Sequence, residues 1–336
     1  MEKIDVTCLF RKRGDRFSIE RVFSTIIGRL RSDFPDIDVR CAEMPRGGAS
    51  PRSLLSNLRY CFKLRKRLIH ITGDIHYCAL ALKRSKYIIT IHDMVLLERK
   101  NKLSRFIFLW FWYKLPVRRA GCVTCISEQT KAQLLKFCGP VKVPIYVIPD
   151  PVDGGFVYSP KEFDRQCPVI LHVGTKENKN LFRVIEAVKN IPCVLRVVGR
   201  LTKEQEECLK SSAIRYSSCH DISDRQMVDE YRNADVVCFP SLFEGFGMPI
   251  IEAQATGRVV VTSDISPMTE VAGGAACLVD PHDVGSIRDG LCKVIADSAY
   301  RERLISAGLE NVRSYHPDVI AGKYMELYRK FNSGKR

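Results

Sequence analysis

Residues 239–257 read FPSLFEGFGMPIIEAQATG and begin at the end of the β-branched run Asp235–Phe239. Two glycines, Gly245 and Gly247, then lead into an apolar segment that starts with Pro249, a residue favoured in the first turn of a helix. We therefore predict a strand, a glycine turn and a helix start. The first N–H groups of a helix have no internal partner and attract negative charge, so this order of elements predicts an anion site.

Two carboxylates flank the predicted anion site. Glu244 precedes the turn and Glu252 lies in the predicted helix, 252 − 244 = 8 positions further on. Carboxylates beside a phosphate would repel it, so we expect both to accept hydrogen bonds from hydroxyls elsewhere on the ligand. The implied ligand carries a diphosphate and sugar hydroxyls. In the alternative interpretation, Glu252 only complements the helix N-terminus and Glu244 is a solvated loop charge.

The pair of glutamates around a Gly-Phe-Gly turn resembles the signature of the retaining glycosyltransferases of group 1 (family 4). The resemblance implies that Glu244 contacts the donor sugar and that Glu252 binds the ribose diol. It also implies that the turn at Phe246, Gly247 and Met248 contacts the diphosphate and the sugar. The implied fold is GT-B, an α/β architecture of two Rossmann-like domains facing a cleft, with a C-terminal helix that crosses back to the N-terminal domain.

A second glycine turn follows the predicted strand Val169–Val173. Gly174, Thr175 and Lys176 open a loop that leads to Lys179 and a helix, and an ammonium group suits a phosphate as a point charge. Lys179 followed by Asn matches the family's Lys-Asn or Lys-Gly, whose lysine binds the donor diphosphate. The family usually places an Arg before that lysine, where Thr175 stands here, so Lys176 and Arg200 are the candidates for a second cation.

A histidine ends the β-branched run of residues 87–91 in the N-terminal half. His92 and Asp93 lie at the carboxyl end of that predicted strand, where ligands gather in open α/β sheets. The family often carries Thr-any-His-Asp here, and the resemblance implies that His92 faces the donor sugar from the opposite domain. Otherwise His92 is a satisfied end-of-strand residue and Asp93 a helix cap.

The order of segments predicts two domains. Strand-like and helix-like segments alternate along the chain, which is typical of βαβ units around parallel sheets. The Pro- and Gly-rich residues 144–155 predict a linker. We expect residues 1–152, with 316–336 as the crossing helix, to form the acceptor-side domain, and residues 153–315 to bind the nucleotide sugar.

Composition limits the partners. The formal net charge of +15 predicts an acidic partner such as nucleic acid, anionic lipid or a phosphorylated substrate. Basic residues are dispersed and no nucleic-acid-binding module is recognisable, so nucleic acid ranks last and is not a predicted partner. No apolar stretch approaches the length of a membrane span and residues 1–5 lack the apolar region of a signal peptide, which predicts a cytoplasmic protein.

Three further features of the sequence lead to predictions. The fourteen cysteines lie mostly in apolar runs and are predicted to be reduced and structural, with Cys122 and Cys125 on opposite faces of a strand. The basic loop 11–16, before a helix predicted from Ser18, fits either an acceptor or phosphate contact or solvated charge. Residues 102–119, KLSRFIFLWFWYKLPVRR, fit either a buried helix or one that lies on an anionic membrane, which would make the protein peripheral on the inner face of the membrane.

The sequence therefore predicts a retaining glycosyltransferase that moves a sugar from a nucleoside diphosphate sugar to a hydroxyl of a glycan or lipid-linked acceptor. We expect a role in bacterial cell-surface polysaccharide synthesis, with no cofactor and no metal. Asp36-Ile37-Asp38 is similar to the metal-binding motif of another glycosyltransferase class, but its place after Pro35 favours a turn. The alternatives are a sugar-nucleotide epimerase of the same fold and a non-catalytic basic binding protein.

Overall fold

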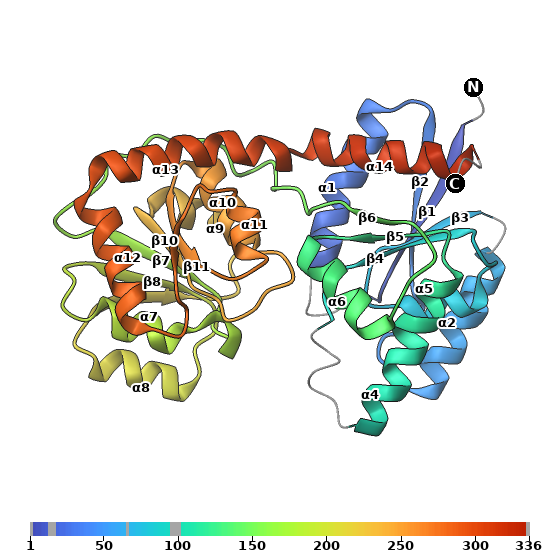
Figure 1. Cartoon of the computed structure of the whole chain (residues 1–336), viewed down its shortest axis with the longest axis horizontal. Helices are drawn as coiled ribbons and strands as arrows, with labels where there is room; N and C mark the ends of the chain where they lie inside the picture. Colours follow the sequence, from blue (N-terminus) through green and yellow to red (C-terminus); the bar gives the residue numbers. More distant parts are fainter. Residues whose placement is uncertain (1–2, 13–17, 65–66, 95–101, 334–336) are drawn as a thin grey trace. The chain divides into compact units, whose positions relative to one another are not determined.

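The structure is a computed structural model that describes residues 3–12, 18–64, 67–94 and 102–333. The chain divides into two compact units, one formed by residues 1–151 with 317–336 and the other by residues 152–316. Each unit is built on a six-stranded parallel sheet with helices on both faces, which confirms the predicted α/β fold (Figure 1). Among the described residues, no helix combines the length and apolar character needed to cross a membrane.

The sheet of the first unit has the strand order β2-β1-β3-β4-β5-β6. Its strands are β1 (Ile4–Phe10), β2 (Ile37–Glu43), β3 (Leu68–Ile71), β4 (Tyr87–Ile91), β5 (Cys122–Cys125) and β6 (Ile145–Val147). Its helices are α1 (Ser18–Asp33), α2 (Pro51–Leu64), η1 (His76–Ala81), α4 (Lys102–Phe108), η2 (Leu109–Lys114), α5 (Leu115–Arg119), α6 (Glu128–Cys138) and α14 (Pro317–Asn332). Of these, η1 is a 3-10 helix and η2 is a π-helix.

Alternating side chains of these strands form two separate cores. Ile88 faces the core that contains α1 and α14, whereas Ile89 faces the core that contains α2, η1 and the α4–η2–α5 segment. Cys122 and Cys125 divide between the same two cores, as their spacing predicted. Helix α14 follows the second unit in sequence yet packs on α1 in the first unit, which confirms the crossing helix (Figure 1).

A buried polar contact also ties α14 to the first sheet. Tyr328 on α14 lies 2.6 Å from Nδ1 of His70 on β3, and Nε2 of His70 lies 2.7 Å from the hydroxyl of Thr90 on β4. Burial lowers the pKa of His70 to about 3, so the ring is neutral at neutral pH.

The sheet of the second unit has the strand order β12-β11-β10-β7-β8-β9. Its strands are β7 (Val169–Val173), β8 (Val194–Val198), β9 (Arg215–Cys219), β10 (Val236–Phe239), β11 (Val259–Ser263) and β12 (Cys277–Val279). Its helices are η3 (Glu177–Lys179), α7 (Leu181–Val188), α8 (Lys203–Ser211), α9 (Asp224–Asn233), α10 (Met248–Thr256), α11 (Met268–Ala272), α12 (Val284–Ala296), α13 (Ser298–Asn311) and η4 (Val312–Tyr315).

The structure adds two strands that the sequence did not predict. The predicted linker, residues 144–155, contains the boundary between the two units, after residue 151, but it also contains β6. The polar segment Arg215–Cys219 forms β9. Both are edge strands, which need no continuous apolar run.

Candidate functional site

The two predicted turns lie at one topological position in the second unit. From β7 the chain passes to β8 and β9 on one side, then returns to β10, which pairs with β7 on the other side. The carboxyl ends of β7 and β10 therefore flank a topological switch point, where open α/β sheets form a crevice for ligands. Gly174–Lys179 follows β7, and Glu244–Glu252 follows β10.

An ion pair joins the two turns. Nζ of Lys179 lies 2.6 Å from Oε1 of Glu244, and both side chains are mostly buried. The same ammonium group lies 4.7 Å from the ring centroid of Phe239, the last residue of β10. An ammonium group has three donors, so one contact with Glu244 leaves donors for a second anion. The structure thus brings together the cation and the carboxylate that the sequence predicted as catalytic.

Gly174 makes room for the lysine. Its φ of +93° lies in a region that favours glycine, and a Cβ at this position would stand 2.9 Å from Cγ of Lys179. Because carbon atoms do not approach so closely, a side chain at residue 174 would displace the stem of Lys179.

Two asparagines hold the turns against each other. The sequence did not single out Asn178, and it gave Asn180 only as the second residue of the family's Lys-Asn pair. Asn178 donates hydrogen bonds to the carbonyl of Phe243, at 3.1 Å, and to Oε1 of Glu244, at 3.3 Å. Asn180, at a left-handed φ of +67°, donates to the carbonyls of Pro240 and Pro281 at 2.9 and 2.7 Å. These contacts connect positions sixty or more residues apart, so spacing along the chain could not reveal them.

The helix α10 begins at the glycine turn as predicted. Gly247, with φ +118°, is its N-cap, and within the described part of the chain no side chain hydrogen-bonds there as a cap. Phe246 is buried and packs edge-on against Tyr315 at 5.7 Å, while Met248 is partly exposed. The turn therefore presents backbone N–H groups at the start of a helix, the geometry that suits an anion.

The second carboxylate is more buried than a solvated helix charge would be. Glu252 on α10 is 7% exposed, and its Oε2 accepts a 2.5 Å hydrogen bond from the hydroxyl of Tyr231 on α9. The alternative in which Glu252 only complements the helix N-terminus does not describe it, because the residue lies beyond the first turn of α10 and is bonded to Tyr231.

Thr175, which stands where the family usually has an Arg, contacts Arg200 at the carboxyl ends of β7 and β8. The hydroxyl of Thr175 donates to the carbonyl of Arg200 at 2.6 Å, and the Thr175 carbonyl accepts from Gln205 at 2.7 Å. The guanidinium of Arg200 is exposed and pairs with Asp221 at 2.5 Å, and Lys176 is also exposed. Thr175 therefore orders this loop, and both candidate cations stand at its surface.

His92 lies in the first unit at the end of β4. Its Nε2 is 2.7 Å from the carbonyl of Thr72, and its Nδ1 is 4.0 Å from Oδ2 of Asp150. Burial raises the pKa of Asp150, and the neighbouring histidine opposes that shift. Both ring nitrogens thus face groups of the same unit. The sequence had assigned Asp150 only to the linker, and its partnership with His92 was missed.

A second cluster stands at the switch point of the first sheet, between β1 and β3. Arg11 forms a bidentate pair with Glu20, at 2.8 and 2.9 Å, and also pairs with Asp74. The predicted acceptor or phosphate loop 11–16 includes this arginine, but its residues 13–16 lie outside the described residues. The two acidic partners neutralise Arg11.

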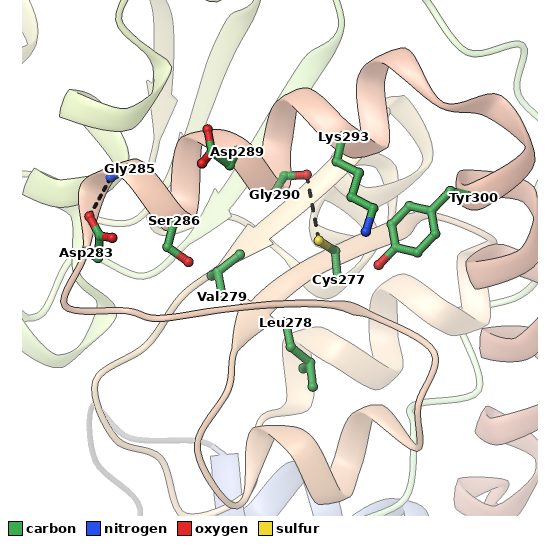
Figure 2. A pocket seen from close by; sticks show the side chains of 10 residues that line it. All are labelled: Cys277, Leu278, Val279, Asp283, Gly285, Ser286, Asp289, Gly290, Lys293 and Tyr300. Carbon is green, nitrogen blue, oxygen red and sulfur yellow. Dashed lines mark hydrogen bonds between the residues drawn. The ribbon is translucent and has the colours of Figure 1, made fainter.

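No group of three or more metal-ligating side chains occurs in the described ranges. Asp38 of the Asp-Ile-Asp sequence pairs with Arg40, and Asp36 pairs with Arg329. A pocket beside β12 and α12 is lined by residues that include Cys277, Lys293 and Tyr300, and Figure 2 shows Lys293 directed at the Tyr300 ring. None of the predicted site residues lines this pocket.

Each half of the chain matches a known glycosyltransferase family. Residues 159–311 match the family described as Glycosyl transferases group 1, and residues 2–154 match Glycosyltransferase Family 4. The chain belongs to the group 1, family 4 glycosyltransferases, as the spacing of Glu244 and Glu252 predicted.

Individual proteins of known name are similar to parts of the chain. O-antigen chain mannosyltransferase B of Escherichia coli is 28% identical over 173 residues, which cover 47% of this chain and 45% of that protein. Phosphatidyl-myo-inositol mannosyltransferase of Mycobacterium leprae (strain TN) is 34% identical over 143 residues, 40% of this chain and 37% of that protein. The chain thus spans less than half the length of these two relatives.

A solved structure matches the whole chain in fold. Sucrose-phosphate synthase from Thermosynechococcus elongatus superimposes with a TM-score of 0.80 at 17% identity, covering 99% of this chain and 100% of that one. This likeness confirms the GT-B fold.

Proposed function

We propose that this protein transfers a sugar from a nucleoside diphosphate sugar to a hydroxyl of a glycan or lipid-linked acceptor, with retention of configuration at the anomeric carbon. The observation that carries the proposal is the contact of Lys179 with Glu244 beside the N-terminus of α10. A cation, a helix N-terminus and a carboxylate at one switch point match a ligand with both phosphate and hydroxyl groups.

The departing diphosphate is the group that needs stabilisation. The bond between the anomeric carbon and the phosphate oxygen breaks, and the diphosphate takes up the electron pair. Lys179 and the N–H groups around Gly247 and Met248 are the donors that would stabilise this charge. Each such donor lowers the activation barrier by on the order of 3 kcal/mol. The acceptor oxygen bonds to the anomeric carbon, and its proton passes to the departing phosphate.

Glu244 has a binding role in this scheme. Its Oε1 already accepts from Lys179 and Asn178, so the carboxylate both orients the ammonium and offers its remaining acceptor positions to sugar hydroxyls. Glu252, held by Tyr231, accepts from the ribose diol. His92 is the proposed contact to the donor sugar, which requires one ring nitrogen to exchange its present neighbour for a hydroxyl.

The acceptor class is inferred from the relatives. One is named for mannosyl transfer in O-antigen chains and the other for transfer to phosphatidyl-myo-inositol. These names support a glycan or lipid-linked acceptor and a place in bacterial cell-surface polysaccharide synthesis.

Replacing Lys179 by Met tests the central contact, because methionine retains an apolar stem and removes the charge. We expect turnover to fall about 100-fold, which corresponds to roughly 3 kcal/mol, with little change in the unfolding temperature. Lys189→Met is the matched control, since Lys189 forms an ion pair of the same 2.6 Å length with Glu186 at the surface. Equal turnover in both variants would remove Lys179 from the site.

Product analysis tests the reaction itself. NMR of the product should show the donor's anomeric configuration, and an inverted product would refute the retaining mechanism. Conversion of the donor without an acceptor would identify an epimerase, and nucleotide-sugar binding without conversion would identify a binding protein. Activity should also persist in excess chelator, and its loss there would contradict metal-independent transfer.

A further inference from the structure

The segment from Lys102 to Arg119 forms a continuous helical stretch with one buried and one exposed face. On the buried side, the Trp112 ring packs at a tilt against Tyr77, with ring centroids 4.7 Å apart, and its N–H donates a 3.1 Å hydrogen bond to the carbonyl of Asp74. Tyr113 is buried in the same core. The buried helix expected as one alternative is therefore present, but it accounts for only part of the aromatic side chains.

The exposed face carries large apolar side chains that the core does not use. Phe106, Ile107 and Phe111 are 59%, 49% and 45% exposed. Trp110, which is partly exposed, has its ring centroid 6.1 Å from that of Phe106. We call Phe106, Ile107, Trp110 and Phe111 the aromatic face. Neighbouring exposed apolar side chains are unusual on a soluble surface and mark an interaction site.

Basic side chains border the aromatic face. Nζ of Lys114 lies 5.2 Å and the guanidinium of Arg118 5.6 Å from the Trp110 ring centroid. Residues 102–119 contain five basic residues and no acidic one, namely Lys102, Arg105, Lys114, Arg118 and Arg119. A partner with negative charge above an apolar interior complements both features, and an anionic lipid bilayer has that composition.

Helix α2 repeats this composition on the same side of the first sheet. It packs on η1, which packs on η2, and it exposes Leu55 and Phe62, each 51% exposed. Arg52, Arg59 and Lys63 are exposed on the same helix. Two elements of one layer thus combine exposed apolar and basic side chains.

We propose that the aromatic face of η2 and α4, with Lys114 and Arg118, docks the protein on the surface of an anionic membrane. The apolar rings enter the headgroup region and the two cations contact lipid phosphates, while the partly buried Trp112 and the buried Tyr113 hold the helix to the core. The docking goes beyond the proposed transfer reaction, since it requires neither donor nor acceptor.

Tryptophan fluorescence tests the surface directly, because the chain has only two tryptophans and both lie in this segment. Equimolar phosphatidylglycerol and phosphatidylcholine vesicles should shift the emission to shorter wavelength as Trp110 leaves water, and pure phosphatidylcholine should not. The Trp110→Phe variant should show no shift in emission, yet it should still co-sediment with anionic vesicles. A shift that survives in Trp110→Phe would place the contact elsewhere.

Variants separate the electrostatic contribution of the two cations to vesicle binding from the apolar contribution of the phenylalanine rings. Lys114→Gln/Arg118→Gln should weaken vesicle binding about 30-fold, since each cation near an anionic surface contributes about a factor of five. Phe106→Ser/Phe111→Ser should weaken it on the order of tenfold. Phe182→Ser, which alters a 50% exposed phenylalanine of α7, should bind as the unaltered protein does. Equal losses in the Phe106/Phe111 and Phe182 variants would overturn the proposal.

Two outcomes point to other partners. If the unaltered protein ignores anionic vesicles but Phe106→Ser/Phe111→Ser changes its sedimentation mass, the aromatic face joins two copies of the chain and the proposal is wrong. Thermal stabilisation by nucleotide sugars should be the same in all these variants. If nucleotide sugars stabilise the unaltered protein but it does not bind anionic vesicles, the docking alone is refuted. Absent stabilisation in the unaltered protein refutes the proposed function instead.

Discussion

Replacing Gly174 by Ala should separate the backbone cost of this turn from its role in placing Lys179. At φ +93° an L-residue costs about 1–2 kcal/mol. The new Cβ would also stand 2.9, 3.1 and 3.2 Å from Cγ, Cε and Cδ of Lys179. The lysine stem must therefore move, and its 2.6 Å ion pair with Glu244 is lost. That loss adds on the order of 1 kcal/mol to the destabilisation.

Gly274→Ala is the matched control for this substitution. Gly274 has φ +76°, and no atom of the described residues lies within 4 Å of an added Cβ, so the variant carries the backbone cost alone. Both variants should lower the free energy of unfolding in urea, with Gly174→Ala lower by about a further 1 kcal/mol.

Turnover is the decisive assay. If Lys179 stabilises the departing diphosphate, Gly174→Ala should approach the loss of Lys179→Met, up to about 100-fold, while Gly274→Ala stays near the unaltered rate. Equal stability and equal turnover in the two alanine variants would show that the stem of Lys179 does not depend on the glycine, and would refute the reasoning.

Three further outcomes are expected. Tyr231→Phe keeps the ring but removes the donor to Glu252, so the free energy of unfolding should fall by about 2 kcal/mol in urea titrations and nucleotide-sugar affinity should fall in calorimetry. Because burial raises the pKa of Asp150 in the folded state, its contribution to stability is lost as pH rises through that pKa and the carboxyl group ionises. Asparagine cannot ionise, so Asp150→Asn should raise the melting temperature more at pH 7 than at acidic pH. Burial lowers the pKa of His70 to about 3, so its contribution to the free energy of unfolding is lost as pH falls below about 6.5. Between pH 7 and pH 5 this loss amounts to about 2 kcal/mol. In urea titrations at these two pH values, His70→Gln should lose less stability than the unaltered protein.

Each of these three predictions can be contradicted by a specific result. Unchanged nucleotide-sugar affinity in Tyr231→Phe would mean that the Glu252 carboxylate does not depend on this donor for its position. A melting temperature of Asp150→Asn that moves in parallel with the unaltered protein across pH would contradict a raised pKa for Asp150. An equally steep acid loss in His70→Gln would assign the acid sensitivity to other buried groups, of which His172, with a pKa lowered to about 4, is a candidate.

Local sequence was informative wherever a pattern repeats along one element. The run before Phe239 and the glycines after it predicted β10, the turn and α10, because a buried parallel strand is continuously apolar and a helix start has its own residue preferences. The same logic missed β9, whose sequence RYSSC is polar because it lies at the sheet edge. It also left the segment 102–119 undecided, since apolar composition does not reveal which side chains find a core.

By itself, the sequence determined the α/β class and the family, and it predicted the residue types of the candidate site, since these predictions depend on spacing within single elements. Only the tertiary structure decided the partners. The sheet order brings Lys179 to Glu244, 65 residues away, and the return of the chain along β6 brings Asp150 to His92. Such contacts are set by which strands pair and which side chains remain outside the cores, and neither is a property of neighbouring residues. For the same reason, the exposed aromatic face of η2 became visible only once Trp112 and Tyr113 were seen to fill the core.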